Sequence, residues 1–251
     1  PATIRASPLR LPSPCVGAPC GVLPVVEPPS EGAPARLVIQ ADALAWLNEN
    51  AAEPGDAVVT SLPDVSELPL LGPGLDGWKR WFIDAAARVM TWTEPGMPSL
   101  FFQSDVRYHG QWLDKAFLVQ LAAEQVGATL VFHKIVCRKP PGTLTNGRAS
   151  YSHLLAFTRG APLVVKKASA DVLPEAGEMP WSRAMGTRAC EAACRFLLDE
   201  TQARRVVDPF CGKGTVLAVA NSLGLDALGV ELSGKRCRAA RKLSLAALAS
   251  A

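Results

Sequence analysis

The sequence predicts an α/β fold in which helices cover both faces of a mainly parallel sheet. From residue 36 to the end of the chain, short apolar runs alternate with segments of helical periodicity, which is typical of parallel sheets with crossover helices. Near the end, one such strand leads into a Gly-x-Gly turn and then a helix. The chain has 251 residues, 49% of them hydrophobic, which is enough for the core of one large domain.

The predicted strands are short runs rich in Val, Ile, Leu and Phe. They cover residues 36–40, 57–60, 99–103, 129–137, 150–158, 163–167, 205–207 and 227–230. The predicted helices cover residues 41–51, 78–92, 113–126, 185–199 and 216–223, with a last helix from Ser233. We expect a mainly parallel seven-stranded sheet with a C-terminal antiparallel hairpin formed by residues 150–158 and 163–167.

The first 35 residues follow a different pattern. Nine of the 21 prolines lie there, and proline excludes both a helix interior and a central strand. We expect residues 1–35 to form an extended arm or linker and residues 36–251 to form the folded domain.

Charge and cysteine content narrow the class of protein. The net charge is only +3, but residues 134–148 carry four basic residues and no acid, and residues 231–242 carry five against one. Such local patches favour an anionic ligand, although solvated surface faces would give the same pattern.

No apolar run approaches the roughly 18 residues of a membrane span. Seven irregularly spaced cysteines indicate buried thiols in the cytoplasm or another reducing compartment, without a zinc site.

The most informative segment is the glycine turn after residue 207. A strand ends in Asp208, the turn Pro-Phe-Cys-Gly-Lys-Gly-Thr follows, and the next strand ends in Glu231. Glycines let the backbone approach a ligand, a helix amino end offers free N–H groups, and an acid at the second strand end suits ribose hydroxyls. Leu217 stands where a dinucleotide fingerprint has its third glycine, so we expect no nicotinamide cofactor.

These motifs resemble the S-adenosylmethionine site of class I methyltransferases, a Rossmann-like fold, and above all that of the N4/N6 amino-methylases of nucleic acids. In many of those proteins the cofactor motif follows the catalytic motif, and this chain has the same permuted order. The resemblance spans residues 35–243 and implies S-adenosylmethionine as cofactor. The cofactor residues that it implies are Asp42, Ser61, Met185, Gly186, Asp208, Pro209, Phe210, Cys211, Gly212, Gly214, Thr215, Glu231 and Leu232.

The catalytic tetrapeptide of that family has its counterpart in Ser61-Leu-Pro-Asp64. The family pattern is Asp, Asn or Ser, then Pro-Pro, then an aromatic residue that stacks on the flipped base. Ser61 and Pro63 fit this pattern, whereas Asp64 replaces the aromatic residue. A carboxylate can accept a proton instead. The methyl acceptor could therefore equally be an amine or a group that must lose a proton, such as a ring nitrogen or a hydroxyl. Asp105, after the strand 99–103, is a further catalytic candidate.

The candidate substrate-binding residues are cations and aromatic side chains near strand ends. Arg107 could hold an acceptor, and Lys134, Arg138 and Lys139 could hold phosphate oxygens, while a turn salt bridge or a charged strand edge would explain them equally. The histidines have no ligand spacing, so we expect no metal site. The remaining candidates are Arg148, Tyr151 and Trp181.

The leading function is therefore methylation of a nucleic-acid base nitrogen. RNA is preferred over DNA, since no separate target-recognition domain is visible and an unpaired base is cheaper to extrude. An anionic small molecule as acceptor, or a catalytically silent subunit with the same fold, remains an alternative. The oligomeric state has no signal in the sequence.

Overall fold

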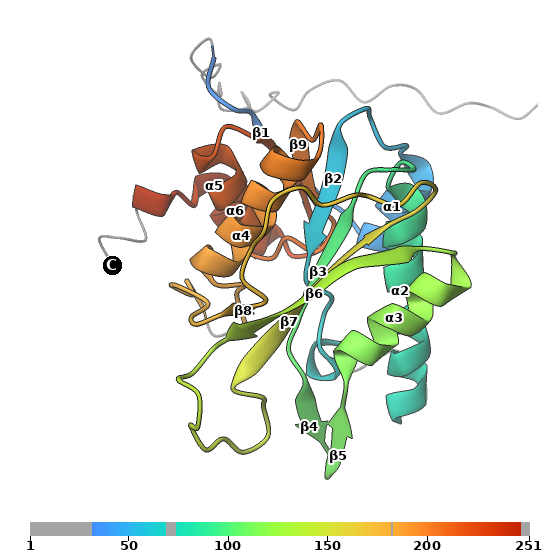
Figure 1. Cartoon of the computed structure of the whole chain (residues 1–251), viewed down its shortest axis with the longest axis vertical. Helices are drawn as coiled ribbons and strands as arrows, with labels where there is room; N and C mark the ends of the chain where they lie inside the picture. Colours follow the sequence, from blue (N-terminus) through green and yellow to red (C-terminus); the bar gives the residue numbers. More distant parts are fainter. Residues whose placement is uncertain (1–31, 69–73, 182, 247–251) are drawn as a thin grey trace, which may run out of the picture.

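The computed structural model describes residues 32–68, 74–181 and 183–246. One eight-stranded sheet runs through the molecule in the order β1-β10-β9-β2-β3-β7-β6-β8, and a separate two-stranded sheet pairs β4 with β5 (Figure 1). The strands are β1 (Arg36–Gln40), β2 (Asp56–Thr60), β3 (Ser99–Gln103), β4 (Val106–Tyr108), β5 (Gln111–Leu113), β6 (Thr129–Cys137), β7 (Tyr151–Thr158), β8 (Val172–Leu173), β9 (Arg205–Asp208) and β10 (Asp226–Glu231).

Six α-helices of the described residues lie in two layers around the sheet. They are α1 (Ala43–Glu49), α2 (Gly74–Trp92), α3 (Lys115–Gln125), α4 (Thr187–Glu200), α5 (Thr215–Ser222) and α6 (Gly234–Lys242). The first three bury their apolar sides on one face of the sheet, and the last three bury theirs on the other. The α/β fold predicted from the alternation of strands and helices is thus confirmed, and most element bounds agree within a few residues.

The sheet is parallel from β1 to β3, and β7 is antiparallel to both of its neighbours. β9 and β10, near the end of the chain, lie between β1 and β2 from its beginning. Parallel strands end at the same edge of the sheet, so the segments that follow β1, β2, β9 and β10 meet there. Segments more than 140 residues apart in the chain thereby share one site, as the 148-residue separation of the Thr60–Asp208 contact illustrates.

The antiparallel hairpin exists, but its strands differ from those expected. β7 pairs with β6, whereas residues 163–167 form no strand. The backbone amides of Lys166 and Lys167 donate to the carboxylate of Glu200 at 2.7 and 2.8 Å, and this side-chain acceptor takes the place of a neighbouring strand. The eighth strand, β8, has two residues and pairs with β6.

The β4–β5 hairpin was not expected. Its turn is His109-Gly110, with φ of 47° and 81°, and two consecutive positive values are what a type I′ hairpin turn requires. A short helical turn, η1 (Val65–Glu67), also follows β2.

Residues 1–31 of the expected arm lie outside the described part of the chain. All five described cysteines are free and buried, as expected. Among the described helices, none is long and apolar enough to cross a membrane.

Candidate functional site

A cavity of about 820 Å³ opens at the carboxyl ends of β1, β2, β9 and β10. Open α/β sheets place ligands at this edge, where the strand order reverses. Eleven of the thirteen expected cofactor residues line the cavity: Asp42, Ser61, Met185, Asp208, Pro209, Phe210, Cys211, Gly212, Thr215, Glu231 and Leu232.

The two expected cofactor residues outside the lining are glycines with packing roles. A Cβ atom at Gly186, the N-cap of α4, would lie 2.1 Å from the carbonyl oxygen of Ala176. A Cβ at Gly214 would lie 2.9 Å from Cα of Ala240 in α6. Both glycines therefore permit close contact between backbones, and neither contacts the cavity directly.

Gly212, unlike Gly186 and Gly214, lines the cavity and faces an aromatic side chain. Its φ is 55°, and a Cβ atom there would come within 2.8 Å of the indole ring of Trp181. Trp181 thus lies against the glycine turn at the cavity wall, and Lys213 Nζ lies 4.8 Å from the centre of its ring. Trp181, which we expected to bind the substrate, lines the cavity and also packs against the turn expected to hold the cofactor.

Asp208, Glu231 and Asp42 place three carboxylates at the ends of adjacent strands. Thr60 donates its hydroxyl to Asp208 Oδ1 at 2.6 Å, and the amide of Phe210 donates to the same oxygen at 3.1 Å. Burial raises the pKa of Asp208 to about 7, against the opposing effect of these hydrogen bonds. Glu231 Oε1 accepts from the amide of Ser233 at 2.7 Å, and Asp42 Oδ1 accepts from Ala45 at the start of α1.

The cavity also holds an unpartnered polar atom. Thr215 Oγ1 is buried in the cavity wall and makes no hydrogen bond with the described residues. A buried hydroxyl without a partner is costly, so this atom is a ready contact for a polar ligand.

The tetrapeptide lies partly in the cavity. Ser61, Leu62 and Pro63 line it, whereas Asp64 does not. Asp64 caps η1 by accepting from the amide of Val65, and its carboxylate lies 3.0 Å from Arg148 and 3.8 Å from Lys115. Burial lowers the pKa of Lys115, and Asp64 opposes that shift.

A second polar cluster surrounds Asp105, beyond Asp64. Asp105 Oδ2 lies 3.0 Å from His153 Nε2, and His153 Nδ1 lies 2.8 Å from His133 Nε2. Burial opposes ionisation of Asp105, but hydrogen bonds from His153 and from the Lys115 amide outweigh it and lower its pKa. Tyr151 stacks edge-on against His153 at 5.3 Å. Sequence reasoning did not find a partner for His133, because the contact depends on the pairing of β6 with β7.

Most of the expected substrate-binding cations contact other protein groups, and none lines the cavity. Lys134 is buried and donates to the carbonyl oxygen of Ala170 at 2.8 Å. Arg138 donates to Ser104 at 2.9 Å, and Arg148 pairs with Asp64. Arg107 lies 6.0 Å from the ring centre of Trp112, and Lys139 is exposed.

Several cavity residues were not identified from the sequence. Trp81 of α2 lines the cavity and contacts Phe210 edge-on at 6.1 Å. Glu67 pairs with Arg183 at 2.9 Å and approaches Arg236 at 3.8 Å, so it connects three distant segments at the cavity. Helical periodicity marks Trp81 only as a core candidate, and the Glu67 contacts depend entirely on tertiary structure.

No protein-family model matches the chain, and no curated protein matches it either. Solved structures do. A putative DNA modification methylase from Thermus thermophilus, complexed with S-adenosyl-L-methionine, matches with a TM-score of 0.62 and 21% identity over 83% of this chain and 93% of that one. The cytosine-N4-specific PvuII DNA methyltransferase matches with a TM-score of 0.62 and 15% identity, over 88% of this chain and 94% of that one. The M1.HpyAVI complex with S-adenosylmethionine matches with a TM-score of 0.57 and 16% identity, over 82% of this chain and 98% of that one.

The chain has a methyltransferase fold. Within this fold, the order of elements along the chain is the permuted one expected: the strand that leads into Ser61 precedes the glycine turn.

Proposed function

We propose that this protein is an S-adenosylmethionine-dependent methyltransferase that acts on a nucleic-acid base nitrogen. The observation that carries the proposal is the cavity at the carboxyl edge of the sheet, which combines a glycine turn with carboxylates at three adjacent strand ends. The fold shared with DNA methylases supports the same activity.

The cavity residues fit S-adenosylmethionine by their chemistry. Glu231 offers a carboxylate oxygen, Oε2, to ribose hydroxyls, and Asp42 offers one to the adenine edge. The turn from Asp208 to Thr215 would hold the methionine part, and the unpartnered hydroxyl of Thr215 supplies a polar contact. When bound, the cofactor supplies an electrophilic methyl group, and the cavity residues act by orienting the two reactants.

Ser61 and Pro63 mark the acceptor side of the cavity. The hydroxyl of Ser61 can accept a hydrogen bond from an acceptor N–H, as the resemblance to amino-methylases implies. The tetrapeptide lacks an aromatic residue, but Trp81 and Trp181 lie in the same cavity and could provide a surface for a base. Asp64, which we also proposed as a catalytic group, contacts Lys115 and Arg148, and these contacts favour a positioning role.

We take DNA as the first substrate to test, because the structurally similar proteins are described as DNA methylases. This departs from the preference for RNA that the absence of a recognition domain suggested. An anionic small molecule, or a silent partner subunit, remains the competing function.

The first experiment measures cofactor binding by isothermal titration calorimetry. Glu231→Ala should weaken S-adenosylmethionine binding by about 1–3 kcal/mol, the cost of leaving polar groups unpaired. Glu124→Ala, an exposed position on α3, is the matched control and should bind normally. Equal affinity in the two variants would rule out the assignment of Glu231, and binding of nicotinamide dinucleotide instead would move the protein to another class.

The second experiment identifies the acceptor. Transfer of a tritiated methyl group is measured on duplex DNA, single-stranded DNA, total RNA and a metabolite extract. We expect incorporation into nucleic acid at a base. Label found only in small molecules would favour the competing function, and cofactor binding without any transfer would favour a silent subunit.

A further inference from the structure

Helix α6 carries three exposed cations that tertiary contacts do not explain, and the helix dipole favours only Lys242, which lies in the last turn. Lys235, Arg238 and Lys242 are exposed, and among the described residues their side chains have no hydrogen-bond or ion-pair partner. The spacing of three and seven residues puts them on one face of the helix. Cys237 and Ala240, on the opposite face, are buried in the core.

The other cations of this helix are held by the protein. Arg241 donates to the carbonyl oxygen of Val38 at 2.7 Å, and Arg236 lies 3.8 Å from Glu67 and 3.9 Å from Glu231. From residue 232 to residue 246 the chain has no acidic residue. Lys235 also lies in the first turn of α6, where the helix dipole disfavours a cation, so helix stability does not explain its charge.

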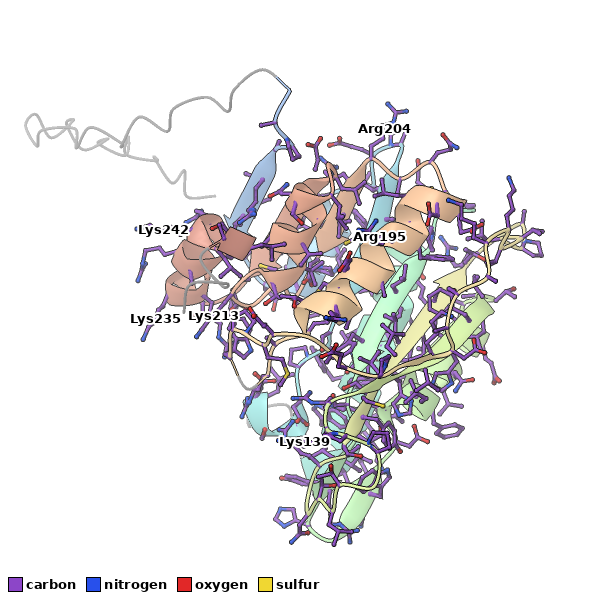
Figure 2. The ribbon with its side chains drawn as sticks, turned by 60° about the vertical axis from the view of Figure 1, so that its left-hand side comes forward. Lys139, Arg195, Arg204, Lys213, Lys235 and Lys242 are labelled. Atoms are coloured by element: carbon purple, nitrogen blue, oxygen red, sulfur yellow. The ribbon has the colours of Figure 1, made fainter. Side chains whose placement is uncertain are left out.

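The row of cations begins at the cavity. Arg236 and Lys213 line the cavity, and Lys235 follows beside them at the amino end of α6. Figure 2 shows Lys213, Lys235 and Lys242 on one side of the molecule, whereas Arg204 and Lys139 lie elsewhere. The distance along α6 from residue 235 to 242 is about 10 Å at roughly 1.5 Å per residue, which is about three base-pair steps measured along the axis of a duplex, at roughly 3.4 Å each.

We infer that the face of α6 formed by Lys235, Arg238 and Lys242, together with Lys213 at the cavity, binds the sugar-phosphate backbone of the nucleic-acid substrate. This inference rests on the proposed function and assigns the phosphate contacts to α6. It differs from the expectation for residues 134–148, where Lys134, Arg138 and Arg148 already contact protein groups. Phosphate contacts by lysine and arginine fix the position of a strand without reading its sequence.

The test reverses the three charges in Lys235→Glu/Arg238→Glu/Lys242→Glu. Binding of fluorescein-labelled single-stranded and duplex DNA of mixed sequence is measured by anisotropy over a range of salt concentrations. Each lost phosphate contact lowers the slope of log K against log salt by roughly 0.7–0.9. We therefore expect a slope smaller by roughly 2–3 and an affinity at least about tenfold lower at low salt.

A matched control reverses three exposed cations away from α6, in Arg80→Glu/Arg88→Glu/Arg204→Glu. It changes the net charge of the protein equally. Arg80 and Arg88 lie on α2, on the other face of the sheet, and Arg204 precedes β9, at the edge opposite the cavity. This control should keep most of the wild-type slope, and both variants should bind S-adenosylmethionine within about twofold of wild type.

The outcomes separate this inference from the proposed function. If wild type binds and methylates DNA and the α6 variant retains the full slope, α6 is not the contact and the inference alone fails. If wild type binds cofactor but no nucleic acid at any salt concentration, both fail. A third outcome would also overturn the inference. If the wild type binds anionic phospholipid vesicles, and the charge reversals in α6 abolish this binding but leave DNA binding unchanged, the face belongs to a membrane contact.

Discussion

Trp181 lies directly against Gly212, so that a Cβ atom at Gly212 would be 2.8 Å from the Cζ2 and Cη2 atoms of the indole. The contact joins the segment before α4 to the glycine turn that follows β9. It means that the shape of the cavity wall depends on the absence of a side chain at residue 212.

Gly212→Ala should therefore weaken cofactor binding and lower stability. The φ of 55° alone disfavours alanine by about 1 kcal/mol, and the displaced ring adds to this. In a Trp181→Ala background the steric part of the penalty disappears, and the two substitutions should be less than additive. Calorimetry and urea unfolding of the four proteins measure this, and strict additivity would contradict direct contact.

Asp208 gives a pH dependence with a defined sign. Its pKa is raised by burial to about 7, above about 3.9 in the unfolded chain. The folded protein holds this proton when the unfolded chain has released it, so the contribution to the free energy of unfolding is complete below about pH 4 and is lost as the pH rises through about 7. Asp208→Asn, neutral at every pH, should flatten this part of the profile. Urea unfolding from about pH 5 to about pH 8 tests it, and parallel profiles would contradict the shift.

Asp64→Asn distinguishes a positioning role from a catalytic one. Asparagine preserves the cap of η1 but removes the charge that faces buried Lys115. Loss of one partner of a buried pair costs about 3 kcal/mol, and Asp64→Asn/Lys115→Met should recover much of it. We expect reduced stability with methyl transfer largely retained below the unfolding temperature. Normal stability with abolished transfer would instead support Asp64 as a general base.

Gly186→Ala should disrupt packing more than ligand binding. The added Cβ would lie 2.1 Å from a backbone oxygen of Ala176, which cannot move as a side chain can. Forced overpacking typically costs about 1–3 kcal/mol, occasionally more, and we expect a loss at or above about 3 kcal/mol in urea unfolding. Gly224→Ala is a matched control, because nothing lies within 4 Å of its Cβ position, and only its positive φ should add a cost.

The local elements and the glycine turn could be predicted from the sequence because their determinants are contiguous. The strands 36–40, 99–103 and 129–137 agree with β1, β3 and β6 residue for residue, since each is a largely apolar run between breaking residues. The turn from Asp208 to Thr215 and the acid at Glu231 are also set by short segments, and the structure places Asp208, Thr215 and Glu231 in the wall of one cavity.

Only the tertiary structure decided what surrounds those segments. The strand partner of β7, the contact of His133 with His153 and the pairing of Asp64 with Lys115 join residues far apart in the chain, and they depend on register and on side-chain direction. Whether a cation such as Lys134 is exposed or buried likewise depends on which segment covers it. Hydrophobic periodicity fixes what an element is, whereas the partner of a polar side chain is fixed by the packing of elements against one another.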